Sequence, residues 1–208
     1  MINNAGIVNG LPLLSLPPAA VDRNFRINLL SHYHTLQTFL PDMLKRPSGG
    51  TVVTVASVLG QLGASHLSDY TAAKAGLIAM HASLRAELAS MATLPDAPVG
   101  AGNIKTILVK PGQLSTQMFG SIQTPSNFFG PVVEAVDLAK AIVKAVDGAR
   151  SGVIAVPLYA RYIEWLGVLP VGLQRIARAF SGVDRAMEGF QQNASSSNGG
   201  KSTIVKKN

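Results

Sequence analysis

Hydrophobic positions along the chain follow two spacings in alternation. From Val21 to Leu40, apolar residues recur every three or four positions, which predicts a helix with one buried stripe. The same spacing recurs from Tyr70 to Met91 and from Glu134 to Val146, which predicts two further helices. In the third helix the positions predicted to face inward are Val136, Ala139, Ile142, Val143 and Val146.

Short runs rich in β-branched residues separate these helical stretches. They are residues 51–56 (TVVTVA), 103–109 (NIKTILV) and 152–156 (GVIAV), and each resembles a buried parallel strand. Strands and helices that alternate with short connections predict right-handed crossovers and a parallel sheet, so the predicted class is α/β. Pro41 and the Pro47–Gly50 turn are predicted to end the first helix. A helix is also predicted near 171–180.

Composition agrees with a folded domain and excludes several kinds of site. The 208 residues are 47% hydrophobic and 14% charged, which excludes disorder over most of the chain. Cysteine is absent, so disulfides and thiol nucleophiles are excluded. The net charge of +7 is too small to predict nucleic-acid binding, because part of it lies in the last residues. His32 and His34 point to different faces of a helix, and His66 and His81 lack matching carboxylates, so no metal site is predicted.

The two ends of the chain lead to different expectations. The first residues lack a basic region and a long apolar run, so no signal peptide is predicted and a cytoplasmic location is expected. Residues 191–208 are rich in Ser, Gly and Asn and are predicted to form a disordered polar tail. The predicted division is a strand–helix domain over 1–157, an apolar and basic helical extension over 158–190, and this tail.

One candidate catalytic pair lies at the start of the second predicted helix. Tyr70 and Lys74 are one turn apart, so they share a face with Cβ atoms about 5–6 Å apart. A lysine ammonium near a phenol favours the phenolate, so the pKa of Tyr70 is predicted to fall. A phenol that titrates nearer neutrality can exchange a proton with an alcohol or carbonyl oxygen. Taken alone, such a pair is more often a solvated helix face.

Two polar residues elsewhere support the catalytic interpretation. Ser57 directly follows the run at 51–56, at the carboxyl end of a predicted parallel strand, where ligands bind in open α/β folds. Its hydroxyl could hold a substrate oxygen, although a cap or loop contact is the commoner role of such a serine. Asn28 lies in the middle of a predicted helix, where Asn is unfavourable, which suggests a function. A surface Asn is the alternative.

Five motifs in this order resemble those of the short-chain dehydrogenase/reductase family. They are the NNAG turn at 3–6, Asn28, Ser57, the YxxxK motif at 70–74 and the PGxxxT turn at 111–116. With the strand–helix rhythm, the resemblance extends to about Pro157. It implies a partial Rossmann-type parallel sheet with flanking helices, the carboxyl-terminal portion of a doubly wound fold.

The resemblance also implies roles for these residues. Tyr70 would be the general acid/base, Lys74 would lower its pKa and bind the nicotinamide ribose, and Ser57 would orient the substrate oxygen. Asn28 would position a water in a proton relay. Besides Tyr70 and Lys74, the positions implied to contact the cofactor are Asn4, Ala5, Gly6, Pro111, Gly112, Leu114 and Thr116. The implied reaction is hydride transfer between NAD or NADP and an alcohol/carbonyl pair.

The family's pattern begins with a strand, a glycine-rich turn that binds the pyrophosphate, and a second strand, and none of these precedes Asn3. Their absence is expected to uncover an apolar edge of the sheet. Three explanations are open: a fragment or truncated gene model of a full enzyme, a short form that has lost catalysis, or a chain paired with another chain over that edge. We favour the first.

Residues 158–180 mix aromatic, leucine and arginine side chains. This composition suits an interfacial helix on a bilayer, and it suits equally a cover over the substrate pocket or a dimer contact. The stretch resembles the carboxyl-terminal extension of membrane- or lipid-droplet-associated family members that act on retinoids, steroids and other lipids. It therefore implies an apolar alcohol or carbonyl substrate and a peripheral position on the endoplasmic reticulum or on lipid droplets.

Three further expectations complete this interpretation. Residues 117–131 would form a flexible lid over the substrate. Family members are often dimers or tetramers, so a homo-oligomer is expected by analogy. The alternative function is that of a catalytically inactive chain that acts as a membrane-surface or scaffold protein.

Overall fold

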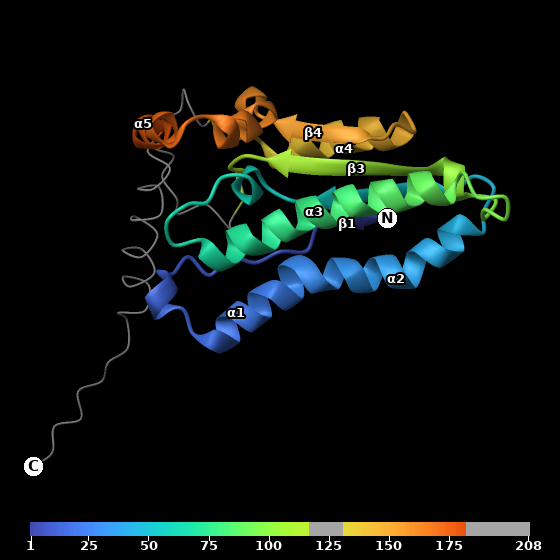
Figure 1. Ribbon diagram of the computed structural model, residues 1–208, viewed down its shortest axis with the longest axis horizontal. Helices are drawn as coiled ribbons and strands as arrows, with labels where there is room; N and C mark the ends of the chain where they lie inside the picture. Colours follow the sequence, from blue (N-terminus) through green and yellow to red (C-terminus); the bar gives the residue numbers. More distant parts are fainter. Residues whose placement is uncertain (117–130, 182–208) are drawn as a thin grey trace, which may run out of the picture.

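The centre of the molecule is a parallel β-sheet. A computed structural model describes residues 1–116 and 131–181. Its four strands lie in the order β1-β2-β3-β4, and every neighbouring pair is parallel (Figure 1). They comprise β1 (Ile2–Asn3), β2 (Gly50–Val55), β3 (Ile104–Pro111) and β4 (Gly152–Val156). The three strand runs found in the sequence and the α/β class are therefore confirmed.

Helices cover both faces of this sheet. They comprise α1 (Pro18–Phe25), α2 (Ser31–Leu44), α3 (Ser68–Met91), α4 (Ala135–Asp147) and α5 (Val171–Ser181). Short 3-10 helices at Leu158–Arg161 and Ile163–Val168 connect β4 to α5. No helix in the described part of the chain is long and apolar enough to span a bilayer.

The core forms two layers because successive residues of a buried strand point to opposite faces. On one face, Val52 of β2 and Leu108 of β3 pack with Leu77 of α3 and with side chains of α2. On the other face, strand residues of the opposite parity, such as Val53, pack against Leu138 of α4. Both α2 and α3 therefore lie on one side of the sheet and α4 lies on the other.

The first predicted helix is interrupted in one place and longer in another. A π-helical turn, Arg26–Leu30, separates α1 from α2, so the turn that contains Asn28 is wider than a regular helical turn. The prediction that Pro41 ends the helix is wrong, because α2 continues to Leu44. Met43, in that last turn, is buried in the core, and this packing outweighs the single hydrogen bond that the proline removes.

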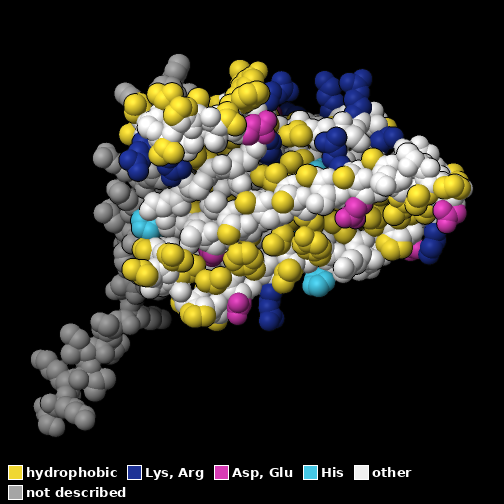
Figure 2. All heavy atoms as spheres, viewed as in Figure 1, with side chains coloured by type: hydrophobic (Ala, Val, Ile, Leu, Met, Phe, Trp, Pro, Cys, Tyr) yellow, Lys and Arg dark blue, Asp and Glu magenta, His cyan; other side chains and the backbone are white. Residues whose placement is uncertain are grey.

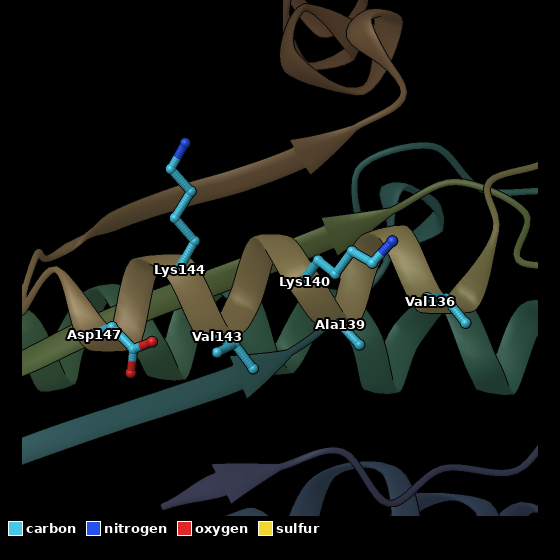
Figure 3. A pocket seen from close by; sticks show the side chains of 6 residues that line it. All are labelled: Val136, Ala139, Lys140, Val143, Lys144 and Asp147. Atoms are coloured by element: carbon cyan, nitrogen blue, oxygen red, sulfur yellow. The ribbon is translucent and has the colours of Figure 1, made fainter.

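The predicted orientation of α4 is partly wrong. Leu138 and Ile142 are its buried side chains, whereas Val136, Ala139 and Val143 are exposed. The sheet contacts only one side of α4. The apolar face of α4 is wider than this contact, so some of its apolar side chains remain exposed to solvent. These three exposed residues line a shallow groove of about 550 Å³ with Lys140, Lys144 and Asp147 (Figure 3).

Most of the predicted lid (117–131) and the predicted tail (191–208) lie outside the described residues. The segment after β4 packs on the sheet through Ala160 and Ile163, which contact Val58 in the loop that follows Ser57. This contact places the segment at the carboxyl end of the sheet. The division of the chain at 157 stays a prediction.

Candidate active site

Ser57, Tyr70 and Lys74 meet at the carboxyl end of β2. Ser57 follows this strand directly, and the Lys74 ammonium donates a hydrogen bond to the carbonyl of Val55 at 3.0 Å. A hydrogen bond joins Ser57 to Tyr70, and the Lys74 Nζ atom lies 5.7 Å from the centre of the Tyr70 ring. All three side chains are buried. The geometry therefore brings together the three residues that the sequence analysis singled out.

Ser57 has two contacts at once. Its backbone is extended, and its hydroxyl accepts a hydrogen bond of 3.1 Å from the Leu59 amide, which caps the short 3-10 helix at Val58–Gly60. The capping role considered from the sequence is therefore present beside the contact with Tyr70. The cap fixes the side-chain direction of Ser57, so the hydroxyl is already oriented beside the phenol.

Hydrogen bonds of Asn28 connect the segment after β1 to the π-helical turn between α1 and α2 and to α1. Its amide oxygen accepts from the Ile7 amide at 2.8 Å, and its amide nitrogen donates to the Ile7 carbonyl at 2.9 Å and to the Asn24 oxygen at 2.7 Å. The surface alternative for Asn28 is wrong, because the side chain is fully buried. A Cβ atom on Gly6 would lie 3.0 Å from Asn28 Oδ1 and 3.6 Å from Lys74 Nζ, so this turn approaches both residues closely.

The direction of the pKa shift predicted for Tyr70 is wrong for this structure. Burial raises the pKa of Tyr70 to about 12, and the hydrogen bond with Ser57 lowers it by less. Burial also lowers the pKa of Lys74 to about 8. Both shifts have the same cause, since a dry environment disfavours the phenolate and the ammonium alike. The spacing of the two residues in the sequence shows their proximity but not their desolvation.

The residues implied to hold a cofactor lie at the same edge of the sheet. Asn4, Ala5 and Gly6 follow β1, and Asn4 and Ala5 are exposed. The PGxxxT turn follows β3, with Pro111 as the last residue of that strand. Because the strands are parallel, both turns end at the carboxyl edge beside Ser57.

The turn after β1 has an unpartnered buried donor that a polar ligand could satisfy, and the turn after β3 packs closely against Tyr159. The buried side-chain nitrogen of Asn3 (Nδ2) has no hydrogen-bond partner among the described residues, which leaves a donor at the end of β1. A Cβ atom on Gly112 would lie 2.6 Å from the Tyr159 hydroxyl and 2.9 Å from the Pro157 ring, so a side chain here would displace one of these residues. Leu114 forms a bridge with Val133, and the Thr116 amide donates to the Leu114 carbonyl at 2.8 Å, so this turn is ordered as far as Thr116.

A polar network that the sequence analysis missed connects this site to the segment after β4. Buried Lys110, in β3, donates to Glu164 at 3.3 Å, and Gln61 donates to the same carboxylate oxygen at 2.9 Å. Arg178 of α5 donates to the Gly63 carbonyl at 2.7 Å. These contacts join residues far apart in the sequence, so no local motif indicates them. They hold the segment after β4 against the loop between Ser57 and Tyr70.

Gly60 sets how closely the Ser57 loop approaches α3. A Cβ atom at this position would lie 2.8 Å from the backbone of Lys74 and 2.8 Å from the Ile78 side chain. Replacing Gly60 with Ala is therefore expected to destabilise the chain by about 1–3 kcal/mol, because the loop must move away from the helix. Urea unfolding would measure the loss. Replacing Gly102, which has open space around it, with Ala is the matched control, and equal effects of the two changes would contradict the prediction.

Two histidines, His32 and His81, are buried, which the sequence analysis did not predict. His32 lies one helical turn after Asn28, and His81 shares a contact of 3.0 Å with the Thr54 hydroxyl. Burial, together with the positive charge of Lys74, lowers the pKa of His32 to about 4. Burial and Arg85 lower the pKa of His81 to about 4. Both rings are therefore neutral at pH 7.

These histidines predict a loss of stability in mild acid. Their unfolded pKa of about 6.5 exceeds the folded value, so the unfolded chain binds more protons as the pH falls from 6.5 to 4. At pH 5 we expect each to lower the free energy of unfolding by about 2 kcal/mol relative to pH 7.5. Urea unfolding at the two pH values should show a smaller difference in His32→Leu and in His81→Leu. The control is His34→Gln, at an exposed position, which should leave the difference unchanged.

A parallel α/β sheet with buried Ser, Tyr and Lys at one carboxyl edge defines a Rossmann-like class of protein, and comparison with known proteins identifies the family. The family model described as short chain dehydrogenase matches residues 1–127. The chain therefore belongs to the short-chain dehydrogenase/reductase family, as its motifs predict.

Relatives and solved structures agree with this assignment. The chain is 34% identical over 185 residues to the uncharacterized oxidoreductase TDA5 of Saccharomyces cerevisiae, which covers 88% of this chain and 54% of that protein. It is 38% identical over 119 residues to human retinol dehydrogenase 10, which covers 57% of this chain and 32% of that protein. The structure of a short-chain dehydrogenase of Burkholderia cenocepacia, solved with NADP, superposes with a TM-score of 0.65 at 22% sequence identity. The match covers 86% of this chain and 66% of that chain, and it shows that the two share a fold. The chain spans about half the length, or less, of these curated relatives.

Proposed function

We propose that the protein is an NAD- or NADP-dependent oxidoreductase that interconverts an alcohol and its carbonyl, with Tyr70 as the general acid/base. The proposal rests chiefly on the buried contact of Tyr70 with Ser57, beside Lys74, at the carboxyl end of β2. Membership of an oxidoreductase family and the names of the relatives support it.

In this proposal the residues of the site accept the hydroxyl proton of the alcohol and orient the substrate oxygen. During oxidation the hydroxyl proton of the alcohol passes to the Tyr70 oxygen, and the carbon-bound hydrogen leaves with its electron pair. A nicotinamide cofactor held at this edge of the sheet would supply the acceptor for that hydride. Ser57 donates a hydrogen bond to the same substrate oxygen, and Lys74 holds its positive charge toward the phenol. Asn28 fixes the turn at 4–6 against the helix and keeps a path for a water that exchanges protons with Lys74.

The Tyr70 pKa of about 12 applies to the chain without ligands. Lys74 is already in place at that pKa, so proton transfer near neutrality would need a further positive charge close to the phenol, which an oxidised nicotinamide would supply. Asn4, Ala5 and Gly6 would lie beside the adenosine half of the cofactor. The backbone of Pro111, Gly112 and Leu114, with the Thr116 hydroxyl, would lie beside the nicotinamide half.

A label-transfer experiment tests the reaction class. The purified chain is incubated with NAD⁺ or NADP⁺ and with apolar alcohols deuterated at the carbinol carbon. The proposal expects one deuterium per turnover to appear in the reduced cofactor together with the carbonyl product. Tight cofactor binding without any deuterium transfer across the alcohol panel would contradict the proposed activity and favour the non-catalytic alternative.

We infer further that the substrate is apolar, of the retinoid or steroid type. The loop after Ser57 and the segment after β4 share an apolar cluster, and its partly buried members Leu59, Leu62 and Leu166 leave apolar surface on this side of the site. The similarity to a protein named retinol dehydrogenase 10 supports this class of substrate. A homo-oligomer and a peripheral position on the endoplasmic reticulum or on lipid droplets belong to the same proposal.

The alternative, a non-catalytic protein at a membrane surface, has one specific observation in its favour. The segment from Leu158 through α5 exposes large apolar side chains, and Trp165 and Val168 are 63% and 74% exposed. Figure 2 shows hydrophobic side chains beside Lys and Arg side chains over this part of the molecule. Aromatic, aliphatic and arginine residues in one exposed segment are typical of binding to an anionic lipid surface.

The single tryptophan of the chain makes this surface directly testable. On addition of vesicles that contain phosphatidylserine, Trp165 emission is expected to shift to shorter wavelength, because the indole leaves water. Val168→Asp should weaken vesicle binding by about tenfold, since a charge enters the apolar contact. Val99→Asp, at a similarly exposed apolar position outside the segment, is the control. No shift at any vesicle concentration, together with a dimer in solution, would identify this surface as a subunit contact instead.

A further inference from the structure

A buried carboxylate stands directly before Tyr70. Asp69 is the second residue of α3, is 4% exposed and forms no salt bridge with any residue of the described ranges 1–116 and 131–181. A carboxylate removed from water without a cation is costly unless hydrogen bonds satisfy it. Neither the family motifs nor the chemistry proposed above uses this side chain.

Both carboxylate oxygens of Asp69 accept short hydrogen bonds from different parts of the chain. Oδ1 accepts from the Tyr70 amide at 2.7 Å, and Oδ2 accepts from the Asn9 side-chain amide at 2.6 Å. The same Asn9 amide group donates to the Ala20 carbonyl of α1 at 3.2 Å. A carboxylate offers two acceptor oxygens, whereas an amide side chain offers one. The two contacts therefore explain why an acid occupies this position.

The short segment Ile7–Asn9 thereby joins the two helices that hold the site. Both backbone polar groups of Ile7 bond to Asn28, Val8 packs in one cluster with Tyr70, and the side chain of Asn9 bonds to Asp69. This segment directly follows the turn at 4–6. A displacement of that turn would therefore be transmitted to the first turn of α3, where Tyr70 lies.

We propose that Asp69 is a positioning residue, which acts through Asn9 to fix the first turn of α3, and Tyr70 with it, against the segment after β1. The proposal rests on the proposed function, because it assigns Tyr70 a position that matters for proton transfer. Ser57 restrains the Tyr70 hydroxyl at one end of the side chain, and Asp69 restrains the backbone at the other end.

Exchanging the acid and the amide between the two positions tests this role. In Asp69→Asn the new amide can still accept from the Tyr70 backbone, but it places a donor opposite the Asn9 donor. We expect kcat to fall by about 10- to 100-fold, because small displacements of a catalytic group are costly, with KM for the alcohol changed less than about threefold. The double variant Asp69→Asn/Asn9→Asp restores the donor–acceptor pair between the two side chains but loses the bond from Asn9 to the Ala20 carbonyl. It should therefore recover part of the lost kcat, at least about fivefold.

The control is Asp137→Asn, which removes an exposed acid from the first turn of α4 and should leave kcat unchanged. Nuclear Overhauser contacts between the Tyr70 ring and Val8 provide a readout that does not require turnover, and we expect them to weaken in Asp69→Asn and to return in the double variant. If the unchanged chain shows no turnover, the proposed function fails and these contacts alone decide. Wild-type contacts in Asp69→Asn, or a double variant no better than the single one, would overturn the proposal.

Discussion

Replacing Tyr70 with Phe is expected to reduce kcat by about 10²- to 10⁴-fold, the usual contribution of a general acid/base. The ring of Tyr70 is buried beside Leu67 and Val8, and Phe preserves that packing. The substitution removes only the hydroxyl and its hydrogen bond with Ser57. Cofactor binding should therefore persist while proton transfer stops. Turnover of a deuterated alcohol and cofactor titration, measured on the same preparation, separate the two effects.

The control for this variant is Tyr33→Phe, which removes a phenol hydroxyl from a side chain of α2 that is 42% exposed. It should leave both turnover and cofactor affinity unchanged. If Tyr70→Phe retained turnover within a factor of three of the unchanged chain, another group would have to supply the proton, and the role assigned to Tyr70 would be wrong.

The sequence predicted how strands and helices alternate along the chain. The predicted strands are short runs rich in apolar residues, and the predicted helices repeat apolar residues every three or four positions. It also predicted which polar residues meet, because the carboxyl ends of parallel strands share one edge of a sheet. Ser57 follows β2, and the helix that starts near Tyr70 packs on the same strand, so their meeting needs no knowledge of side-chain contacts.

Other features depend on burial and on contacts that the sequence does not display. The π-helical turn at Asn28 forms where that side chain bonds to Ile7, which is far away in the sequence. The pKa of Tyr70 rises because its surroundings are dry, and spacing along a helix shows only that Lys74 is near. On α4, either of two overlapping apolar stripes could face the sheet, and only packing selects the one with Leu138. Asp69 stands in the first turn of a helix, where acids are common for reasons unrelated to a site.

Lys74→Met is expected to make the protein less active and, at neutral pH, more stable. Loss of a cation beside the reacting oxygen should reduce kcat by about 10²- to 10³-fold, as loss of a preorganised donor does elsewhere. Burial lowers the pKa of Lys74 from 10.5 to about 8, so holding this group charged at pH 7 costs the folded state on the order of 3 kcal/mol. Methionine removes that cost but leaves the Val55 carbonyl without its donor, a loss of about 1–3 kcal/mol. A net gain of about 1 kcal/mol is expected.

The pH dependence distinguishes this explanation from a simple improvement in packing. Between pH 8 and 10.5 the unfolded chain holds the Lys74 proton and the folded chain does not, so the stability of the unchanged protein rises with pH. The gain of about 1 kcal/mol from Lys74→Met at pH 7 should therefore change by about 2 kcal/mol and become a loss of about 1 kcal/mol at pH 9.5. Urea unfolding of both proteins at the two pH values measures it, with Lys140→Met, at an exposed lysine of α4, as the control. An advantage that is independent of pH would show that desolvation of Lys74 does not limit the stability of the site. Since burial in the same surroundings raises the pKa of Tyr70, such a result would also count against that explanation of its high pKa.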